Sequence, residues 1–126
     1  MDIDWDALRA AATNAAANAY APYSRLNVGA AALTDTGALV TGVNVENASF
    51  GLTFCAEVSL IGKAMTDGLG RPVALVATDS EGNVLTPCGR CRQILIEMGG
   101  PDLQINEVHT AAELIPGAFL PDDLPE

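Results

Sequence analysis

Positive charge is scarce in this sequence. Six lysine and arginine residues stand against sixteen aspartate and glutamate residues, which gives a formal net charge of -10. No basic cluster is available to neutralise a phosphate backbone, and the net charge would repel a polyanion. A nucleic-acid polymer is therefore a poor candidate partner, whereas a neutral small molecule meets no such repulsion.

Long hydrophobic runs are also absent. No apolar stretch is long enough to cross a bilayer, and the opening residues MDIDWDALRA are acidic where a secretory signal would be basic. We therefore expect a cytoplasmic protein with no membrane partner. The chain has three cysteines, an odd number for a disulfide framework, so metal binding or catalysis is the favoured use of these thiols.

Aromatic residues make up only 5% of the chain, although hydrophobic residues make up 49%. The core must therefore be built mainly from alanine, valine, leucine and isoleucine. A chain of 126 residues suffices for one domain with a real core and is too short for two ordinary ones. Because the sequence shows no internal repeat and no linker, we expect a single domain over residues 1–126.

Helical and extended patterns alternate along the chain in the order α-β-β-α-β-α-β. The predicted elements lie at residues 4–21, 26–35, 38–47, 55–67, 72–80, 88–98 and 103–108, before a weak helical turn at 110–114 and an irregular tail at 116–126. Residues 35–37 (Asp-Thr-Gly) suit a hairpin turn between the first two strands. Val58, Ile61 and Met65 would share one helix face. Alternating helices and buried strands predict an α/β layered domain.

The cysteines fall into two short motifs: Cys88 and Cys91 lie in PCGRCRQ, and Cys55 lies in FCAE. A Cys-x-x-Cys pair is compatible with a thioredoxin-like redox site, although here it comes late in the chain and leaves a third cysteine over. A closed structural zinc site would need a fourth ligand, for which His109 is the one histidine available. The third interpretation is a zinc ion held by three thiolates, with water as the fourth ligand.

Glu57 favours the third interpretation. It lies two residues after Cys55, close enough to reach a metal-bound water if both residues open one helix. Zinc lowers the pKa of such a water, and a carboxylate can then carry its proton. Zinc deaminases show this arrangement as a ligand-x-Glu motif followed by Pro-Cys-x-x-Cys, in which the glutamate is not a ligand. If Cys55 and Cys88 open helices, two positive helix ends would also face the metal.

Four motifs in the right order make the sequence similar to the small homotetrameric cytidine deaminases along nearly its whole length. The matching stretches are APYSRLNVGAA, GVNVENASFGLTFCAE, PCGRCRQ and ELIPGAF. The resemblance implies a single-domain, three-layer α-β-α fold with a central mixed sheet. It also implies one Zn²⁺ per subunit and a homotetramer whose active sites are shared between subunits.

The resemblance also implies roles for individual residues. Cys55, Cys88 and Cys91 would bind zinc, and Glu57 would be the catalytic acid and base. Asn44 and Glu46 would hydrogen-bond the ribose 3′-hydroxyl. The substrate-binding residues of a subunit's own site would be Leu26, Asn44, Glu46 and Ala56. The residues contributed to a neighbouring site would be Ala48, Phe50, Gly51 and Phe119.

Two positions depart from the family pattern. The aromatic residue common after YSx is Leu26 here, so the base would pack on leucine without ring stacking. The arginine that commonly follows CAE is Val58 here. We expect Arg90, inside the Cys-x-x-Cys pair, to supply the missing positive charge beside the thiolates.

The resulting prediction is an enzyme of pyrimidine salvage. It would hydrolyse the C4 amino group of cytidine and 2′-deoxycytidine, with the cytosine nucleoside as its small-molecule partner. One alternative is a blasticidin S-type aminonucleoside deaminase, since such enzymes share PCGRCRQ and lack arginine after CAE. An alternative of another class is a non-catalytic zinc-stabilised binding module.

Overall fold

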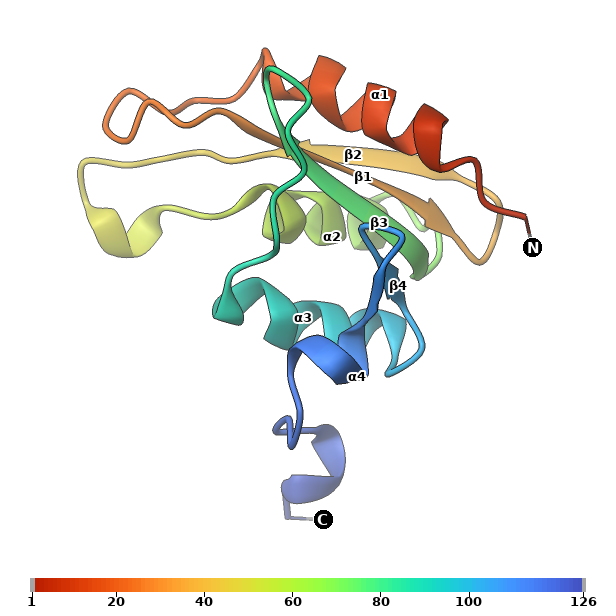
Figure 1. Ribbon diagram of the computed structural model, residues 1–126. Helices are drawn as coiled ribbons and strands as arrows, with labels where there is room; N and C mark the ends of the chain where they lie inside the picture. Colours follow the sequence, from red (N-terminus) through yellow and green to blue (C-terminus); the bar gives the residue numbers. More distant parts are fainter. Residues whose placement is uncertain (1, 126) are drawn as a thin grey trace.

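The computed structural model describes residues 2–125, so Met1 and Glu126, the ends of the predicted domain, lie outside the described part. Three layers stack in the order helix, sheet, helix (Figure 1). The helices of the described part are α1 (Trp5–Ala16), α2 (Ala56–Thr66), α3 (Gly89–Gly99) and α4 (Ala111–Leu114). Helix α1 covers one face of the sheet, and α2 and α3 cover the other. The predicted three-layer α/β fold is confirmed.

The central sheet is mixed, as predicted. Its strands are β1 (Val28–Thr34), β2 (Leu39–Val43), β3 (Pro72–Asp79), β4 (Gln104–Ile105) and β5 (His109–Thr110). They lie in the order β2-β1-β3-β4-β5, with β1 antiparallel to both neighbours and β3 parallel to β4. The turn between β1 and β2 falls at the predicted hairpin, where Gly37 adopts a φ of 85° that glycine accepts without a steric penalty.

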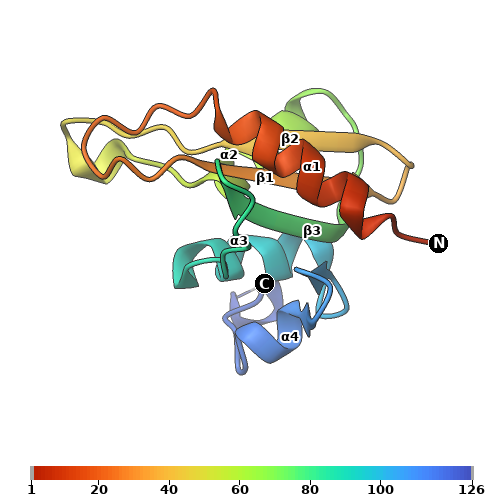
Figure 2. The same cartoon turned by 45° about the horizontal axis from the view of Figure 1, so that its top comes forward.

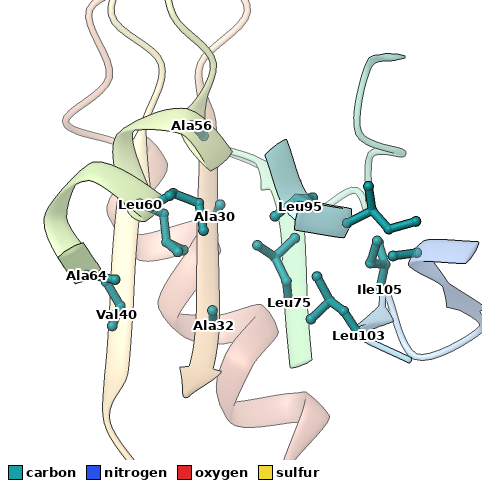
Figure 3. Close-up of a cluster of buried hydrophobic side chains, with 13 residues drawn as sticks. Ala30, Ala32, Val40, Ala56, Leu60, Ala64, Leu75, Leu95, Leu103 and Ile105 are labelled. Atoms are coloured by element: carbon teal, nitrogen blue, oxygen red, sulfur yellow. The ribbon is translucent and has the colours of Figure 1, made fainter. Parts of the chain in front are cut away.

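Alternation along β1 supplies two hydrophobic clusters. Ala30 and Ala32 face α2 and α3, where they pack with Leu60 and Leu95 (Figure 3). The intervening Ala31 belongs to the cluster under α1, because successive side chains of a strand point to opposite faces. Figure 2 shows α1 lying across the strands that form this second cluster. The core is therefore largely aliphatic, as the low aromatic content predicts.

Helix α2 lies unusually close to β2 because of a glycine. A Cβ atom added at Gly42 would lie 2.5 Å from the backbone nitrogen of Leu60 and 2.6 Å from the carbonyl oxygen of Ala56. Both atoms are backbone atoms of α2, so neither can move aside by a change of rotamer. The absence of a side chain at this position thus sets where the first turns of α2 lie.

We expect Gly42→Ala to lower the free energy of unfolding by about 1–3 kcal/mol, the usual cost of overpacking a tight contact. The matched control is Gly62→Ala in α2, the helix that packs against Gly42, because a Cβ added at Gly62 meets nothing within 4 Å. That change should raise stability by about 0.5–1 kcal/mol, because alanine loses less backbone entropy in a helix than glycine does. Urea unfolding of both variants measures the difference, and equal effects would contradict the role of Gly42.

Three predicted boundaries were wrong. The strand predicted at 38–47 ends at Val43. The first helix ends at Ala16 rather than at residue 21, because Tyr20 leaves the helix and donates its backbone N–H to the Asn44 carbonyl at 3.0 Å. Sheet-like pairing thus overrides the helix propensity of the alanines. The strand predicted at 103–108 is shorter, and β5, which pairs back on β4, was not predicted.

The predicted face of the second helix was also partly wrong. Met65 is 45% exposed, whereas Leu60 and Ala64 are buried together with Ile61. The face that α2 presents to the sheet is therefore rotated from the predicted one. In the described part of the chain, none of the helices is both long enough and apolar enough to cross a membrane.

Candidate metal centre and active site

Two helices present cysteines from their first turns. Cys55 is the N-cap of α2, Cys88 is the N-cap of α3, and Cys91 lies in the first turn of α3. Both helices begin on the same side of the molecule (Figure 1). The three sulfur atoms lie within 4.8 Å of one another, so the sequence motifs that lie more than thirty residues apart converge on one point.

The spacing of the thiols fits a tetrahedral metal ion. The Sγ atoms of Cys55 and Cys88 lie 3.7 Å apart. Two thiolates bound to zinc at about 2.3 Å with tetrahedral angles would lie about 3.8 Å apart. Helix N-termini favour negative charge, so both cap positions suit thiolates. The donor set is therefore chemically and geometrically suited to zinc.

Hydrogen bonding among the thiols shifts the pKa values of Cys55 and Cys91 in opposite directions. Hydrogen bonding to Cys91, helped by Cys88 and by the positive charge of Arg90, lowers the pKa of Cys55 to about 6, although burial opposes the shift. The same bond to Cys55, together with burial, raises the pKa of Cys91. All three cysteines are free thiols. One thiolate is thus favoured near neutral pH, and a bound cation would stabilise the others.

The alternatives for the cysteines can be compared with this geometry. Within the described residues, the metal-binding group contains the three cysteines and does not include His109. His109 Nδ1 instead lies 3.9 Å from the carboxylate of Glu113 at the start of α4. The closed site of three cysteines and a histidine is therefore not formed. A simple redox pair leaves Cys55, which contacts Cys88, without a role.

Glu57 points into the same cavity as the cysteines. It lies in the first turn of α2, is only 4% exposed and lines the cavity. Burial raises the pKa of Glu57 to about 6, and the negative charge of Cys55 adds to the shift. A carboxyl group with such a pKa can both accept and donate a proton near neutral pH.

The cavity has a volume of about 400 Å³ and brings most of the predicted residues together. The predicted residues that line it are Leu26, Asn44, Glu46, Cys55, Ala56, Glu57, Cys88 and Cys91. The lining residues that sequence analysis missed are Ser24, Val28, Thr53, Phe54, Ala77, Leu85 and Thr86. Ser24 and Val28 lie within the APYSRLNVGAA stretch, which was a usable signal. Leu85 carries no such signal, because it reaches the cavity only through the fold of its loop.

Asn44 and Glu46 already make hydrogen bonds within the chain. The Asn44 amide accepts from the backbone N–H of Val28 at 2.9 Å and donates to the Leu26 carbonyl at 2.9 Å. Glu46 accepts from the hydroxyl and the backbone N–H of Ser24, and these bonds lower its pKa. Both side chains are therefore fixed in place, and each keeps some hydrogen-bonding capacity for a ligand.

The residues predicted to act on a neighbouring subunit lie outside this cavity. Ala48, Phe50 and Gly51 are exposed beside it, and Phe50 is 75% exposed. Phe50 lines a second hollow of about 390 Å³ together with Tyr23, Ser24, Glu46 and Thr53. Phe119 is 57% exposed in the C-terminal segment, where its carbonyl accepts from the side chain of Gln93. Their predicted roles across an interface stay predictions.

Arg90 links the two cysteine motifs. Its Nη1 donates to the backbone carbonyl of Thr53 at 3.1 Å, two residues before Cys55. Its positive charge also contributes to the lowered pKa of Cys55. Its predicted compensation for Val58 stays a prediction.

Most of the chain matches the model of a known protein family. The cytidine and deoxycytidylate deaminase zinc-binding region matches residues 4–107. The chain belongs to this deaminase family. A cytidine deaminase of Mycobacterium tuberculosis is 54% identical over 127 residues, covering 98% of this chain and 96% of the relative. A cytidine deaminase of Halalkalibacterium halodurans is 40% identical over 122 residues, covering 90% of this chain and 92% of the relative.

The fold of the family is shared as well. A crystal structure of a mutant cytidine deaminase from M. tuberculosis matches this structure with a TM-score of 0.94 at 52% identity. The match covers 98% of this chain and 100% of that chain. Zinc is the metal of this deaminase family, and the three converging thiols of this member form the group that can bind it.

Proposed function

We propose that this protein catalyses the hydrolytic deamination of cytidine and 2′-deoxycytidine to uridine and 2′-deoxyuridine, with release of ammonia. The observation that carries the proposal is a buried carboxyl group, Glu57, in one cavity with three convergent thiols. The 54% identity to a cytidine deaminase supports the same reaction. The metal-binding residues would be Cys55, Cys88 and Cys91.

Zinc bound at these thiols supplies a Lewis acid that makes hydroxide available from water near neutral pH. The residues of the chain handle the protons. Glu57 would take one proton from the attacking water and deliver it to N3 of the pyrimidine ring. It would then take the remaining proton from the new hydroxyl group on C4 and pass it to the amino group, which leaves as ammonia. Burial of Glu57 keeps its carboxyl group poised for both transfers, since it raises the pKa to about 6.

Substrate selection would depend on two groups of residues that line the cavity, one polar and one apolar. Asn44 and Glu46 would hydrogen-bond the ribose 3′-hydroxyl, and their places on the cavity wall support that role. Leu26 and Ala56 would contact the base. A free base would leave the polar pair without a ligand partner, so cytosine should be a much poorer substrate than cytidine.

An absorbance assay for loss of cytidine, run beside a zinc count on the purified protein, tests the proposal. We expect turnover of cytidine to exceed turnover of blasticidin S and of free cytosine. Faster turnover of blasticidin S would favour the aminonucleoside alternative. One zinc per chain without deamination of any cytosine nucleoside would favour the binding-module alternative.

We also propose a cytoplasmic homotetramer with shared sites. Large exposed apolar side chains support an interface, among them Phe50 beside the cavity and Phe119 in the C-terminal segment. In such an assembly Ala48, Phe50 and Gly51 would help line a neighbouring site, and Phe119 would stack near the base.

Arg90 is proposed to compensate for the absence of a positive charge at Val58. We expect Arg90→Ala to weaken zinc binding about 3- to 10-fold, because the guanidinium group no longer offsets the thiolate charge near Cys55. Competition with a coloured chelator measures the affinity. Arg71→Ala is the matched control, since it removes an exposed arginine at the opposite end of β3 from the cavity. Equal zinc affinity in both variants would reject the role of Arg90.

A further inference from the structure

Asn106 is a buried polar residue directly after β4, and it is only 8% exposed. Strand β4 pairs with β3 through just two residue pairs, Ala74 with Gln104 and Leu75 with Ile105. Asn106 then adopts a left-handed backbone conformation with a φ of 55°, which asparagine tolerates better than most residues. The chain leaves the sheet at this point, so the next backbone groups of β3 need another partner.

The side-chain amide of Asn106 provides that partner. Its Oδ1 accepts from the backbone N–H of Ala77 on β3 at 3.1 Å, and its Nδ2 donates to the backbone carbonyl of Leu85 at 2.9 Å. The N–H of Leu85 donates in turn to the carbonyl of Ala77 at 2.9 Å. One buried side chain thus joins the end of β3 to the loop that leads to α3.

This loop carries part of the metal centre. It turns at the end of β3 and passes back beside that strand before α3 begins (Figure 1). Leu85 lines the cavity, and Cys88 follows three residues later. The carbonyl of Pro87 accepts from Nε of Arg92 at 2.8 Å. The segment from Leu85 to Cys88 is therefore held at one end by Asn106 and at the other end by α3.

We propose that Asn106 is a positioning residue for the metal centre, which holds the loop so that Cys88 meets the other two thiols. The inference rests on the proposed zinc deaminase function. The Sγ atoms of Cys88 and Cys55 lie 3.7 Å apart before any metal is considered, so the thiols are close to their binding geometry. Without the hydrogen bond to Leu85, the segment that carries Cys88 would be less ordered before zinc binds. Zinc binding would then also have to order this segment, and the entropic cost would lower the zinc affinity.

The simpler account is that Asn106 only stabilises the fold. Its loss would then lower the free energy of unfolding, and zinc binding would change no more than in any equally destabilised variant. A control with a comparable loss of buried hydrogen bonds, far from the cavity, separates the two accounts.

The main variant is Asn106→Gly. Glycine removes both amide hydrogen bonds and accepts the left-handed backbone without strain. We expect its zinc affinity, measured by chelator competition, to fall about 10- to 100-fold, in the range seen when residues that orient metal ligands are lost. We also expect the thiolate-to-cobalt absorption of the Co²⁺-loaded protein to shift in position or intensity, and kcat/KM for cytidine to fall.

Thr34→Val is the matched control. The Thr34 side chain is fully buried, donates to the Leu69 carbonyl at 2.7 Å and accepts from the Ala38 N–H at 3.1 Å. It lies at the far end of β1 from Val28, which lines the cavity, about 20 Å away along the strand. We expect this variant to unfold at lower urea while its zinc affinity and cobalt spectrum stay within about twofold of the native values.

The proposal is overturned if Asn106→Gly unfolds at lower urea and yet keeps native zinc affinity and a native cobalt spectrum. Should that variant not fold, Asn106→Asp takes its place, because aspartate keeps an acceptor for Ala77 and lacks the donor to Leu85. A smaller shift of the same kind is expected there, and an unchanged spectrum again overturns the proposal. If the native protein deaminates no cytosine nucleoside, the proposed function fails, while the zinc and cobalt measurements still decide the role of Asn106.

Discussion

Replacing Glu57 by glutamine is expected to abolish turnover and to leave zinc in place. Glutamine has nearly the same volume and shape, so the buried position beside the thiols remains filled. It cannot accept a proton, and both proposed proton transfers pass through this carboxyl group. We expect kcat for cytidine to fall by roughly 10³-fold or more, at the upper end of the usual effect of one acid–base group, because one residue serves two transfers.

The matched control is Glu97→Gln, the same chemical change at an exposed position on α3. It should retain native kcat and one zinc per chain. Metal content by atomic absorption and kcat by the loss of cytidine absorbance are measured on the same samples. A Glu57→Gln enzyme with more than a tenth of native turnover, at full zinc content, would reject the assigned role.

Loss of one thiol is expected to remove the metal itself. Cys91 is fully buried at the first turn of α3, and Cys91→Ala leaves two thiolates, too few for the three-sulfur site. We expect the zinc content to fall from one per chain to nearly none at micromolar zinc, and turnover to become undetectable. The native protein should regain both after removal of zinc by a chelator and addition of zinc, whereas the variant should not.

Unfolding gives an independent measure of the same site. A ligand that binds only the folded state stabilises it, by about 2.7 kcal/mol at a concentration one hundred times the dissociation constant. The urea midpoint of the native protein should therefore rise with added zinc, while that of Cys91→Ala should stay constant. A variant that still shows a zinc-dependent midpoint with one bound zinc per chain would contradict the three-thiol site.

The metal centre was the most predictable part of the molecule. Cys55 and Cys88 precede residues with helical periodicity, and as helix caps they place Cys91 and Glu57 in first turns. Spacing along the sequence therefore fixes the directions of these side chains within each helix. The spacing of residues within each helix could not predict that the two helices converge on one point, although the similarity to a known family indicated it.

Other features depend on contacts that local patterns do not contain. The first helix ends earlier than predicted because Tyr20 pairs with Val45, which lies more than twenty residues later in the chain. Asn106 falls within the strand predicted at 103–108, and its hydrogen bonds to β3 and to the loop before α3 appear only in three dimensions. The predicted roles of Phe50 and Phe119 depend on a second copy of the chain, which no property of one sequence places in space.

The contact at Gly42 has a consequence for attempts to alter the substrate range of this enzyme. Helix α2, which is capped by Cys55 and carries Glu57 in its first turn, lies directly on the backbone of β2. Mutant libraries that enlarge side chains on this face of β2 would therefore push α2 away from the sheet and displace Cys55 and Glu57. Diversity is better introduced at cavity residues outside helices and strands, such as Leu26 and Phe54. Catalytic geometry and specificity can then be varied separately during directed evolution.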